Sequence, residues 1–259
     1  MKSPLDNLPL GLICPSCRAA LEWNGEALGC YACGRRVPVK DGIPSFCDSD
    51  AFYEQYISHH VPYHLNPAGL KGAILRLLPY WSWREWRFWR RYVPRGVWLL
   101  DLGCARGREI FAERAAGCVG VDTAFSALAE CARHYRMAVQ SGMNPIPFES
   151  GSFDCVVTSH VIGHIPAAEK DDLCSEIARV LKTGGRSVNV IETDSLHPLV
   201  RFAKQRPQLY YRYFVEPVIE NPVRLAAAEV ALGAVHYTLG QWRYPLDHAQ
   251  FIAAVFEKG

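Results

Sequence analysis

The stretch "LLDLGCARGRE", residues 99–109, joins an apolar run to an acid and to a turn that holds two glycines. The apolar run predicts a buried strand, and the glycines after it are typical of a turn that wraps around a nucleotide. A dinucleotide loop has the pattern G-x-G-x-x-G, whereas here Ala105 stands between Gly103 and Gly107, and Asp101 precedes them. A carboxylate in this loop repels a pyrophosphate and attracts an ammonium group. The stretch therefore predicts a ligand with a cationic end.

The chain around this stretch alternates short apolar runs with amphipathic segments from Val97 to Glu192. We expect strands at residues 97–102, 118–122, 137–140, 153–160 and 186–192, and helices at 107–117, 124–135 and 170–185. Gly117 and the pair Gly184 and Gly185 are expected to end two of the helices. The final residues, "FIAAVFEKG", are expected to form the last strand. The alternation predicts an α/β protein with a mostly parallel, doubly wound sheet.

Polar residues fall at the predicted carboxyl ends of four of these strands: Asp101, Asp122, His160 and Glu192. Ligands of parallel sheets bind at this edge, near the point where the strand order reverses. Asp122 lies at the end of the second strand, where a carboxylate can accept hydrogen bonds from both hydroxyls of a ribose. A ligand with an amino acid end and a ribose is S-adenosylmethionine, which the sequence therefore predicts as the cofactor.

Residues 96–192 resemble a class I S-adenosylmethionine-dependent methyltransferase, a Rossmann-like fold, in "LLDLGCARG", "VGVD", "NPIPFESGSFDCVVTSHVIGHI" and "EIARVLKTGG". The resemblance implies that Asp101 and Gly103 hold the methionine end, that Asp122 holds the ribose and that Met143 packs on the adenine. The other residues expected at the cofactor are Cys104, Ala105, Gly107, Thr123, Asn144 and Ser159.

The adenine side departs from the family pattern. Many relatives carry an acid six residues before the phenylalanine of the "PF" pair, and this chain has Gly142 there. We expect Ser141 or Asn144 to replace the acid, or apolar contact to hold the adenine.

The segment "CPSCRAALEWNGEALGCYACG", residues 14–34, has the spacing C-x2-C-x12-C-x2-C. Each pair forms a knuckle that presents two thiolates, and the "NG" turn between the pairs returns the chain. Four thiolates suit a closed structural zinc site, with two disulfides or a redox pair as the alternatives. The expected metal ligands are Cys14, Cys17, Cys30 and Cys33. Together with "VKDGIP", the segment resembles a Trm112-like zinc ribbon.

Three parts of the chain follow from these patterns: a zinc ribbon at residues 1–48, a helical connecting or lid segment at 49–95, and the methyltransferase domain at 96–259. The connecting segment is rich in rings that either line the substrate side or pack between the domains: Tyr53, Tyr56, His59, His60, Tyr63 and His64. Its "YWSWREWRFWRR" run predicts a helix whose stripe of Trp83, Trp86 and Trp89 packs on the sheet. Contact with lipid or RNA is the alternative for this helix.

The composition excludes several classes of protein. The chain of 259 residues has a formal charge of only +2, so no global field draws it to nucleic acid or membrane. The start lacks the apolar core of a signal peptide, and no run of about 18 apolar residues could span a bilayer. We expect a soluble cytoplasmic protein, in which most of the six cysteines outside the ribbon are small core residues.

Methyl transfer requires a positioned acceptor and, for a hydroxyl or an enolisable carbon, a base. His160 is the first candidate for the base because histidine titrates near neutral pH, and His197 and Glu192 are the next. His164 is expected to be a packed or capping residue.

The sequence favours an enzyme that methylates a small molecule, a lipid precursor or a saccharide. An RNA base methyltransferase is the alternative, because a zinc ribbon also precedes this fold in ribosomal RNA guanine methyltransferases. The ribbon carries a net charge of +1 from seven residues, a weak phosphate-binding surface: Arg18, Arg35, Arg36 and Lys40 against Glu22, Glu26 and Asp41. A noncatalytic scaffold that binds the cofactor is the third reading. The fold hosts O-, N- and C-methylation alike, so the acceptor atom does not follow from it.

Overall fold

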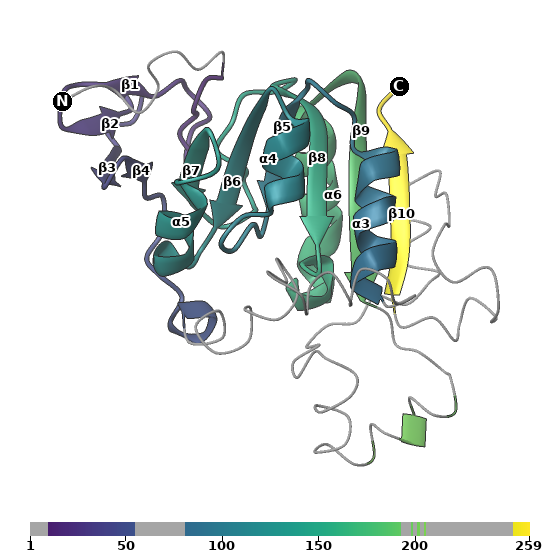
Figure 1. Cartoon of the computed structure of the whole chain (residues 1–259). Helices are drawn as coiled ribbons and strands as arrows, with labels where there is room; N and C mark the ends of the chain where they lie inside the picture. Colours follow the sequence, from purple (N-terminus) through teal and green to yellow (C-terminus); the bar gives the residue numbers. More distant parts are fainter. Residues whose placement is uncertain (1–9, 55–80, 193–197, 199–200, 203–204, 206–250) are drawn as a thin grey trace.

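The protein contains two β-sheets, one in the cysteine-rich segment and one in the main domain (Figure 1). The computed structural model describes residues 10–54, 81–192, 198, 201–202, 205 and 251–259. In Figure 1 the small sheet lies beyond β7, at one end of the large sheet. Among the described residues, no helix combines the length and apolar character needed to cross a bilayer.

The large sheet has six strands in the order β10-β9-β8-β5-β6-β7. They are β5 (Trp98–Leu102), β6 (Gly117–Asp122), β7 (Met137–Gln140), β8 (Phe153–Ser159), β9 (Leu181–Glu192) and β10 (Phe251–Glu257). The strands from β5 to β9 pair in parallel, and β10 pairs antiparallel with β9. The predicted doubly wound sheet is confirmed, as is the last strand at the end of the chain.

Helices cover both faces of this sheet (Figure 1). One face carries α3 (Trp81–Tyr92), α4 (Glu109–Arg114) and α5 (Phe125–Cys131), and the other carries α6 (Lys170–Val180), which two short 3-10 helices, η2 (Ile162–His164) and η3 (Ala167–Glu169), precede. Neighbouring residues of β5 point to opposite faces, so Leu99 packs in the cluster of Phe111 while Leu100 packs in that of Ile177.

Helix α3 packs on the sheet through the carboxyl half of the tryptophan-rich run. Trp89 is 1% exposed, and its ring meets that of Phe111 edge to face at a centroid distance of 5.0 Å. Core packing, one of the readings of this run, is therefore confirmed for Trp89. The side chains of Trp83 and Trp86 lie outside the described part of the chain.

The helices end earlier than the sequence predicted. Gly117 does not end α4 but opens β6, because it pairs with Trp98 and a Cβ there would lie 2.2 Å from the Trp98 ring. Helix α6 stops at Val180 rather than at the glycine pair, since Leu181 already pairs with Phe153 in β9. Helix α5 ends at Cys131, four residues before the predicted end at Tyr135.

The small sheet is an antiparallel meander of four short strands in chain order. They are β1 (Glu22–Trp23), β2 (Ala27–Gly29), β3 (Arg36–Lys40) and β4 (Ile43–Pro44). The predicted turn at Asn24 and Gly25 joins β1 to β2: the Asn24 side chain accepts from the N–H groups of Glu26 and Ala27, and Gly25 has a φ of +96°. We call residues 10–44 the ribbon.

The ribbon is joined to the large sheet by backbone hydrogen bonds. Beyond β4, Ser45 pairs in parallel with Gln140 of β7, and the Phe46 N–H donates to the Gln140 carbonyl at 2.7 Å. On the other side, Leu12 pairs antiparallel with Phe148. Leu12 and Phe148 also belong to one apolar cluster, so the ribbon shares a core with the sheet.

A buried carboxylate holds the ribbon to α6. Glu176 accepts hydrogen bonds from Arg18 of the ribbon at 3.0 Å, from Arg179 at 2.8 Å and from the backbone N–H of Ile146 at 2.9 Å. Burial opposes ionisation of Glu176, but the bonds from Arg179 and Ile146 outweigh it and hold the pKa of the carboxyl below its usual value. Glu176 is therefore charged in the native state.

We expect the variant Glu176→Gln to lower the free energy of unfolding by about 2–4 kcal/mol near neutral pH, because it leaves two arginines without their anion. Since the folded pKa of Glu176 is lowered, its contribution is present above its unfolded pKa and is lost as the pH falls below about 4. Urea unfolding at several pH values measures both effects.

The exposed Glu22 is the matched control, because it lies in β1 without a buried partner. Glu22→Gln should leave the urea midpoint nearly unchanged. Equal losses in the two variants, or a loss for Glu176→Gln that does not shrink in acid, would contradict the assignment of Glu176 as the ribbon's anchor.

Candidate cofactor site and metal centre

The loop after β5 folds around the carboxylate that ends β6. The N–H of Ala105 donates to Asp122 Oδ2 at 2.8 Å, and the N–H of Gly103 donates to the carbonyl of Val121 at 2.8 Å. Gly103, Ala105 and Gly107 all have positive φ, at +67°, +47° and +79°. Two glycines supply this conformation without cost, whereas Ala105 adopts it against its preference. The loop is thus a strained turn that brings the ends of β5 and β6 together.

Gly103 lies beneath side chains from the opposite loops. A Cβ at this position would come within 2.3 Å of Val161 Cγ2 and 3.3 Å of Met143 Cε, so glycine is required. Met143 therefore lies over the loop. A Cβ at Gly142 would meet no atom within 4 Å, so the place of the missing acid is open space.

Asp101 is buried at the end of β5 and is 2% exposed. The hydroxyl of Tyr135 donates to Asp101 Oδ2 at 2.7 Å and accepts from the backbone N–H of Arg108 at 2.7 Å. Burial raises the pKa of Asp101 to about 7, against the hydrogen bond from Tyr135 and the charge of Arg108. Asp101 therefore changes its charge close to neutral pH.

Asp122 is the second buried acid and is 7% exposed. Besides Ala105, the N–H of Ala124 donates to its Oδ1 at 3.0 Å. Burial raises the pKa of Asp122, and the backbone N–H groups oppose the rise. A carboxylate has about four acceptor positions, so the backbone donors do not use all the acceptor positions of Asp122.

Arg108 connects the loop after β5 to the end of β8, since its Nη2 donates to Ser159 Oγ at 2.6 Å. Arg108 and Tyr135 were not predicted from the sequence. Arg108 lies in the stretch 99–109, where a basic residue close to Asp101 was the available signal. Tyr135 had no signal, because it reaches Asp101 from 34 residues along the chain.

Of the three predicted catalytic residues, the structure describes His160 fully, Glu192 only in its backbone and His197 not at all. His160 follows β8 in the left-handed conformation, at φ +59°, is half-buried, and donates its backbone N–H to Val190 at 3.0 Å. Glu192 ends β9 and pairs through its backbone with Phe251, but its side chain is outside the description. His197 lies outside the described residues.

The segment after the ribbon crosses the loops that follow β6 and β7. The Gln140 amide donates to Ser49 Oγ at 2.9 Å and to the carbonyl of Thr123 at 3.0 Å. Tyr53 packs near Ala124, and its ring meets that of His164 edge to face at 6.1 Å. His164 is thus packed, as the sequence predicted.

Two of the residues expected at the cofactor point elsewhere. The Asn144 side chain is exposed and donates to Asp172 of α6 at 3.4 Å, so it does not replace the missing acid in this conformation. The Cys104 thiol is 4% exposed and lies in the apolar cluster under α4 and α5. Only the backbone of Cys104 is available at the loop.

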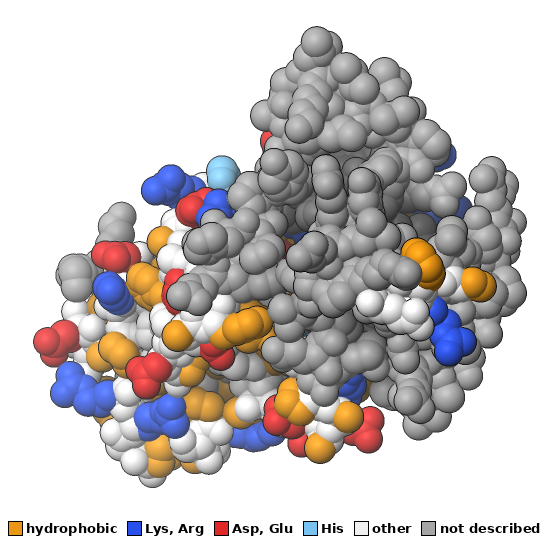
Figure 2. Space-filling view, turned by 90° about the horizontal axis from the view of Figure 1, so that it is seen from below, with side chains coloured by type: hydrophobic (Ala, Val, Ile, Leu, Met, Phe, Trp, Pro, Cys, Tyr) orange, Lys and Arg blue, Asp and Glu red, His pale blue; other side chains and the backbone are white. Residues whose placement is uncertain are grey.

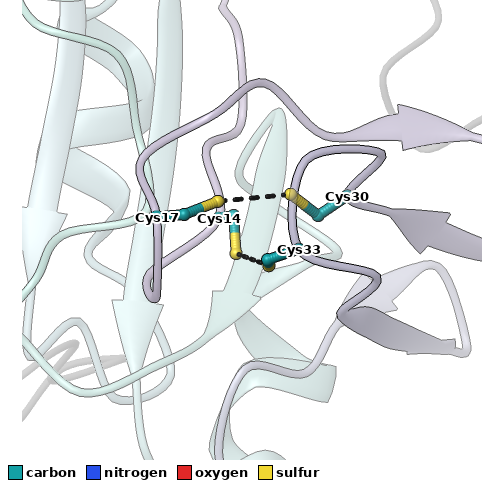
Figure 3. Close-up of side chains that lie close together, drawn as sticks. All are labelled: Cys14, Cys17, Cys30 and Cys33. Carbon is teal, nitrogen blue, oxygen red and sulfur yellow. Dashed lines mark hydrogen bonds between the residues drawn. The ribbon is translucent and has the colours of Figure 1, made fainter.

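The four ribbon cysteines form one cluster, in which all sulfur atoms lie within 4.8 Å of one another (Figure 3). The closest pairs join the two knuckles: Cys14 Sγ lies 3.6 Å from Cys33 Sγ, and Cys17 Sγ lies 3.4 Å from Cys30 Sγ. A disulfide requires about 2.05 Å, so these are not disulfides. Tetrahedral zinc with bonds of about 2.3 Å places its sulfurs about 3.8 Å apart, which the cluster fits.

The knuckle backbones favour the thiolate form that a metal needs. Although burial raises the pKa of Cys14, the N–H groups of Cys17 and Ser16 outweigh it and lower that pKa to about 7. The N–H of Cys33 likewise lowers the pKa of Cys30. The backbone N–H groups of Ala19 and Arg35 act in the same direction on Cys17 and Cys33, but the neighbouring cysteine side chains outweigh them and raise the pKa values of these two thiols. The donor set and its spacing therefore suit a structural metal ion.

The six other cysteines are free thiols: Cys104, Cys118, Cys131 and Cys155 are buried, and Cys47 and Cys174 are half-buried. Core positions were predicted for most of them, and four of the six confirm this.

Comparison with known proteins identifies the large sheet. Residues 100–189 match the methyltransferase domain family. The chain contains a methyltransferase domain. This domain includes both buried acids and Ser159, and the fold of the sheet agrees with it.

Curated relatives of the domain act on different acceptors, as their names state. The demethylmenaquinone methyltransferase of Lactococcus lactis is 32% identical over 153 residues, which cover 54% of this chain and 59% of that protein. A tRNA (carboxymethyluridine(34)-5-O)-methyltransferase of Mus musculus is 27% identical over 97 residues, 37% of this chain and 15% of that protein. The chain thus matches less than two thirds of the length of either relative.

Solved structures share the fold of the methyltransferase domain. An S-adenosylmethionine-dependent methyltransferase from Mesorhizobium loti aligns with a TM-score of 0.50 and 17% identity, over 67% of this chain and 97% of that one. A possible exported protein from Bordetella parapertussis aligns with a TM-score of 0.51 and 16% identity, over 82% and 80%.

We expect the purified protein to carry one zinc ion per chain and Cys33→Ser to lose it, because three thiolates leave the tetrahedral site open. The loss should also lower the thermal midpoint of the whole protein, since the ribbon and the sheet share a core. Native mass spectrometry and thermal unfolding measure the two effects.

Cys174→Ser is the matched control, because this free thiol of α6 lies outside the metal cluster. It should keep the metal. Equal metal content in the two variants would rule out the ribbon as the metal site.

Proposed function

We propose that the chain is an S-adenosylmethionine-dependent methyltransferase that acts on a small-molecule, lipid-precursor or saccharide acceptor, with zinc as a structural ion in the ribbon. The observation that carries the proposal is the pair of buried carboxylates at the ends of β5 and β6, joined by a turn in which Ala105 binds Asp122. One such carboxylate suits the cationic amino acid end of the cofactor, and the other suits the hydroxyls of its ribose.

Each end of the proposed cofactor has a chemical partner at the carboxyl edge. Asp101 would hold the ammonium group, and Arg108 would supply the cation for its carboxylate. Asp122 would accept from the ribose hydroxyls, and Thr123 follows it. The open space beside Gly142, with Met143 as its apolar wall, would hold the adenine. When bound, the cofactor supplies an activated methyl group on a sulfonium.

The chain's own residues then hold the acceptor in line, exclude water and remove a proton. His160 is the proposed base, because it follows β8 directly after Ser159 in a strained backbone conformation. Strained residues of this kind gather at functional sites. Tyr53 and His164 form a wall above the loops of Ala105 and Ala124. Glu192 and His197 stay secondary candidates for the proton acceptor.

The contacts of the ribbon support a small acceptor over a polyanion. Arg18 binds Glu176, Arg36 binds Glu26, and Arg35 donates to Ser16 and to the carbonyl of Phe46. Figure 2, which looks onto the carboxyl edge of the sheet, shows basic and acidic side chains interspersed on the described surface. Phosphate backbones require unpaired cations in a continuous track.

An RNA acceptor is the second candidate. The ring of Tyr31, on the second cysteine knuckle, is 77% exposed and could stack on a base. A cavity of about 730 Å³ between the ribbon and α5 also contains Arg35, Arg36 and Lys40. The acids Asp48 and Glu54 line the same cavity and reduce its positive potential.

We expect the affinity of the native protein for S-adenosylmethionine to increase about tenfold for each unit by which the pH is raised toward 7, and to stay constant above pH 7. The reason is that burial raises the pKa of Asp101 to about 7, and only the ionised carboxylate attracts the ammonium group. Calorimetric titration across this range measures the dependence.

Asp101→Asn should weaken binding and remove the pH dependence, and Asp122→Asn should weaken binding while keeping it. Asp41→Asn is the matched control, because Asp41 lies in an exposed turn of the ribbon. Absence of binding to the zinc-loaded native protein would refute the cofactor assignment, and binding without turnover would favour the scaffold reading.

We expect label from methyl-labelled S-adenosylmethionine to enter the small-molecule, lipid or saccharide fraction of a cell extract rather than its RNA. His160→Asn should slow transfer by about 10²–10⁴-fold without weakening cofactor binding, because asparagine tolerates the left-handed backbone but is no base. Label in RNA that ribonuclease releases would overturn the acceptor class, and unchanged transfer by His160→Asn would exclude this base.

A further inference from the structure

A second charged site lies at the end of the large sheet that is opposite the cofactor loops. There the carboxyl ends of α3 and α4 meet the chain that enters β5, and a cavity of about 50 Å³ opens between them. It is lined by Arg90, Arg95, Ile110, Glu113 and Arg114. Most of β5 lies between this cavity and Asp101, because the three residue steps from Trp98 to Asp101 span about 10 Å at the rise of a parallel strand.

The guanidinium of Arg114 is fixed in this cavity. Its Nε and Nη2 both donate to the carbonyl of Val93, at 2.9 and 2.6 Å. The backbone next to this side chain is also fixed, because the N–H of Gly96 donates to the carbonyl of Arg114 at 2.7 Å. A guanidinium held by one edge presents its remaining N–H groups in a set direction.

The cations of the cavity outnumber its acids. Arg95 is exposed, and within the described part of the chain its side chain takes part in no hydrogen bond or ion pair. Glu113 is the one acid among the residues that line the cavity, and its side chain likewise makes no hydrogen bond or ion pair with the described residues. Partial burial lowers the pKa of Arg114, and the charges of Arg95 and Arg90 lower it further. The guanidinium of Arg114 therefore lies in a positive electrostatic potential, and an anion in the cavity would lower that potential.

We propose that this cavity binds a phosphate group, with Arg114 as the fixed donor and Arg95 as the arm that closes on it. Arginine forks match the oxygens of a phosphate in pairs, which lysine or a single backbone N–H does not. The volume of about 50 Å³ suits a compact anion such as a phosphate group better than a whole nucleotide. The phosphate belongs to a phosphorylated metabolite or to the headgroup of a lipid.

The first test is a thermal unfolding series of the full chain in inorganic phosphate against chloride at constant ionic strength. Phosphate should raise the midpoint of the native protein, because a ligand of the native state stabilises it by mass action. Arg95→Gln should weaken phosphate binding about tenfold, the effect of removing one charge-assisted hydrogen-bond donor. Glu113→Gln should strengthen binding, because it removes the repelling acid.

Arg133→Gln is the matched control, since Arg133 is an exposed arginine at the end of α5, outside the cavity. It should respond to phosphate as the native protein does. No response of the native protein, or equal responses of Arg95→Gln and Arg133→Gln, would overturn the proposal. Because none of these residues belongs to the cofactor site, failure here leaves the proposed methyltransferase activity standing.

Sedimentation with vesicles separates the two sources of the phosphate. Vesicles of phosphatidylcholine with phosphatidylglycerol are compared with pure phosphatidylcholine, for the native protein and for Arg95→Gln. Sedimentation with the anionic vesicles that Arg95→Gln loses assigns the site to a lipid headgroup. A response to inorganic phosphate without sedimentation assigns it to a free phosphorylated molecule. Sedimentation that Arg95→Gln keeps, without a phosphate response, counts against the cavity.

Discussion

The close packing of four cysteine sulfurs is the constraint on which the amino-terminal half of the architecture depends. The strands of the ribbon have only two to five residues, too few to hold themselves together by apolar burial. With the two knuckles joined at sulfur distances of 3.4 and 3.6 Å, Leu12 and Leu28 are carried into the apolar cluster of Phe148. The ribbon thereby becomes one wall of the core and also covers the edge of β7.

The same constraint reaches the cofactor loops through the segment after the ribbon. Ser45 and Phe46 pair with Gln140, and three residues later Ser49 accepts from the Gln140 side chain, whose amide also holds the Thr123 carbonyl. Tyr53 then packs near Ala124. The loop that carries Asp122 is thus supported from the ribbon side, which explains how the cysteine cluster and the candidate cofactor site form one structure.

At the carboxyl edge of the large sheet, the fold keeps residues in energetically unfavourable states at the candidate cofactor site. Two carboxylates are nearly fully buried, which disfavours their charged forms, and two residues that are not glycine, Ala105 and His160, adopt left-handed conformations. Parallel pairing of β5 with β6 on one side and with β8 on the other holds the residues at these strand ends in place. Such local conflicts mark functional positions within an otherwise regular fold.

The sequence predicted what depends on local pattern and missed what depends on long-range contact. Strands of apolar residues, the acids at their carboxyl ends and the knuckle cysteines follow from spacing alone. Helix ends did not, because pairing of Gly117 with Trp98 and of Leu181 with Phe153 decides them, and both contacts join separate segments. Tyr135 and Glu176 were missed for the same reason. Each is an ordinary helix or turn residue until the fold brings its partner to it.

The ion pair of Arg18 with Glu176 joins residues 158 positions apart, so it forms only after α6 has been synthesised. During synthesis the knuckles leave the ribosome long before α6 exists, so the ribbon must persist without the surface that later covers it. Capture of the proposed zinc ion at that stage depends on the knuckles alone. Docking then closes a loop between residues 158 positions apart, and the entropy lost in closing so long a loop slows this step. With zinc as the proposed ion of the ribbon, a cell short of it would meet the defect first in the nascent chain, before any finished domain is present.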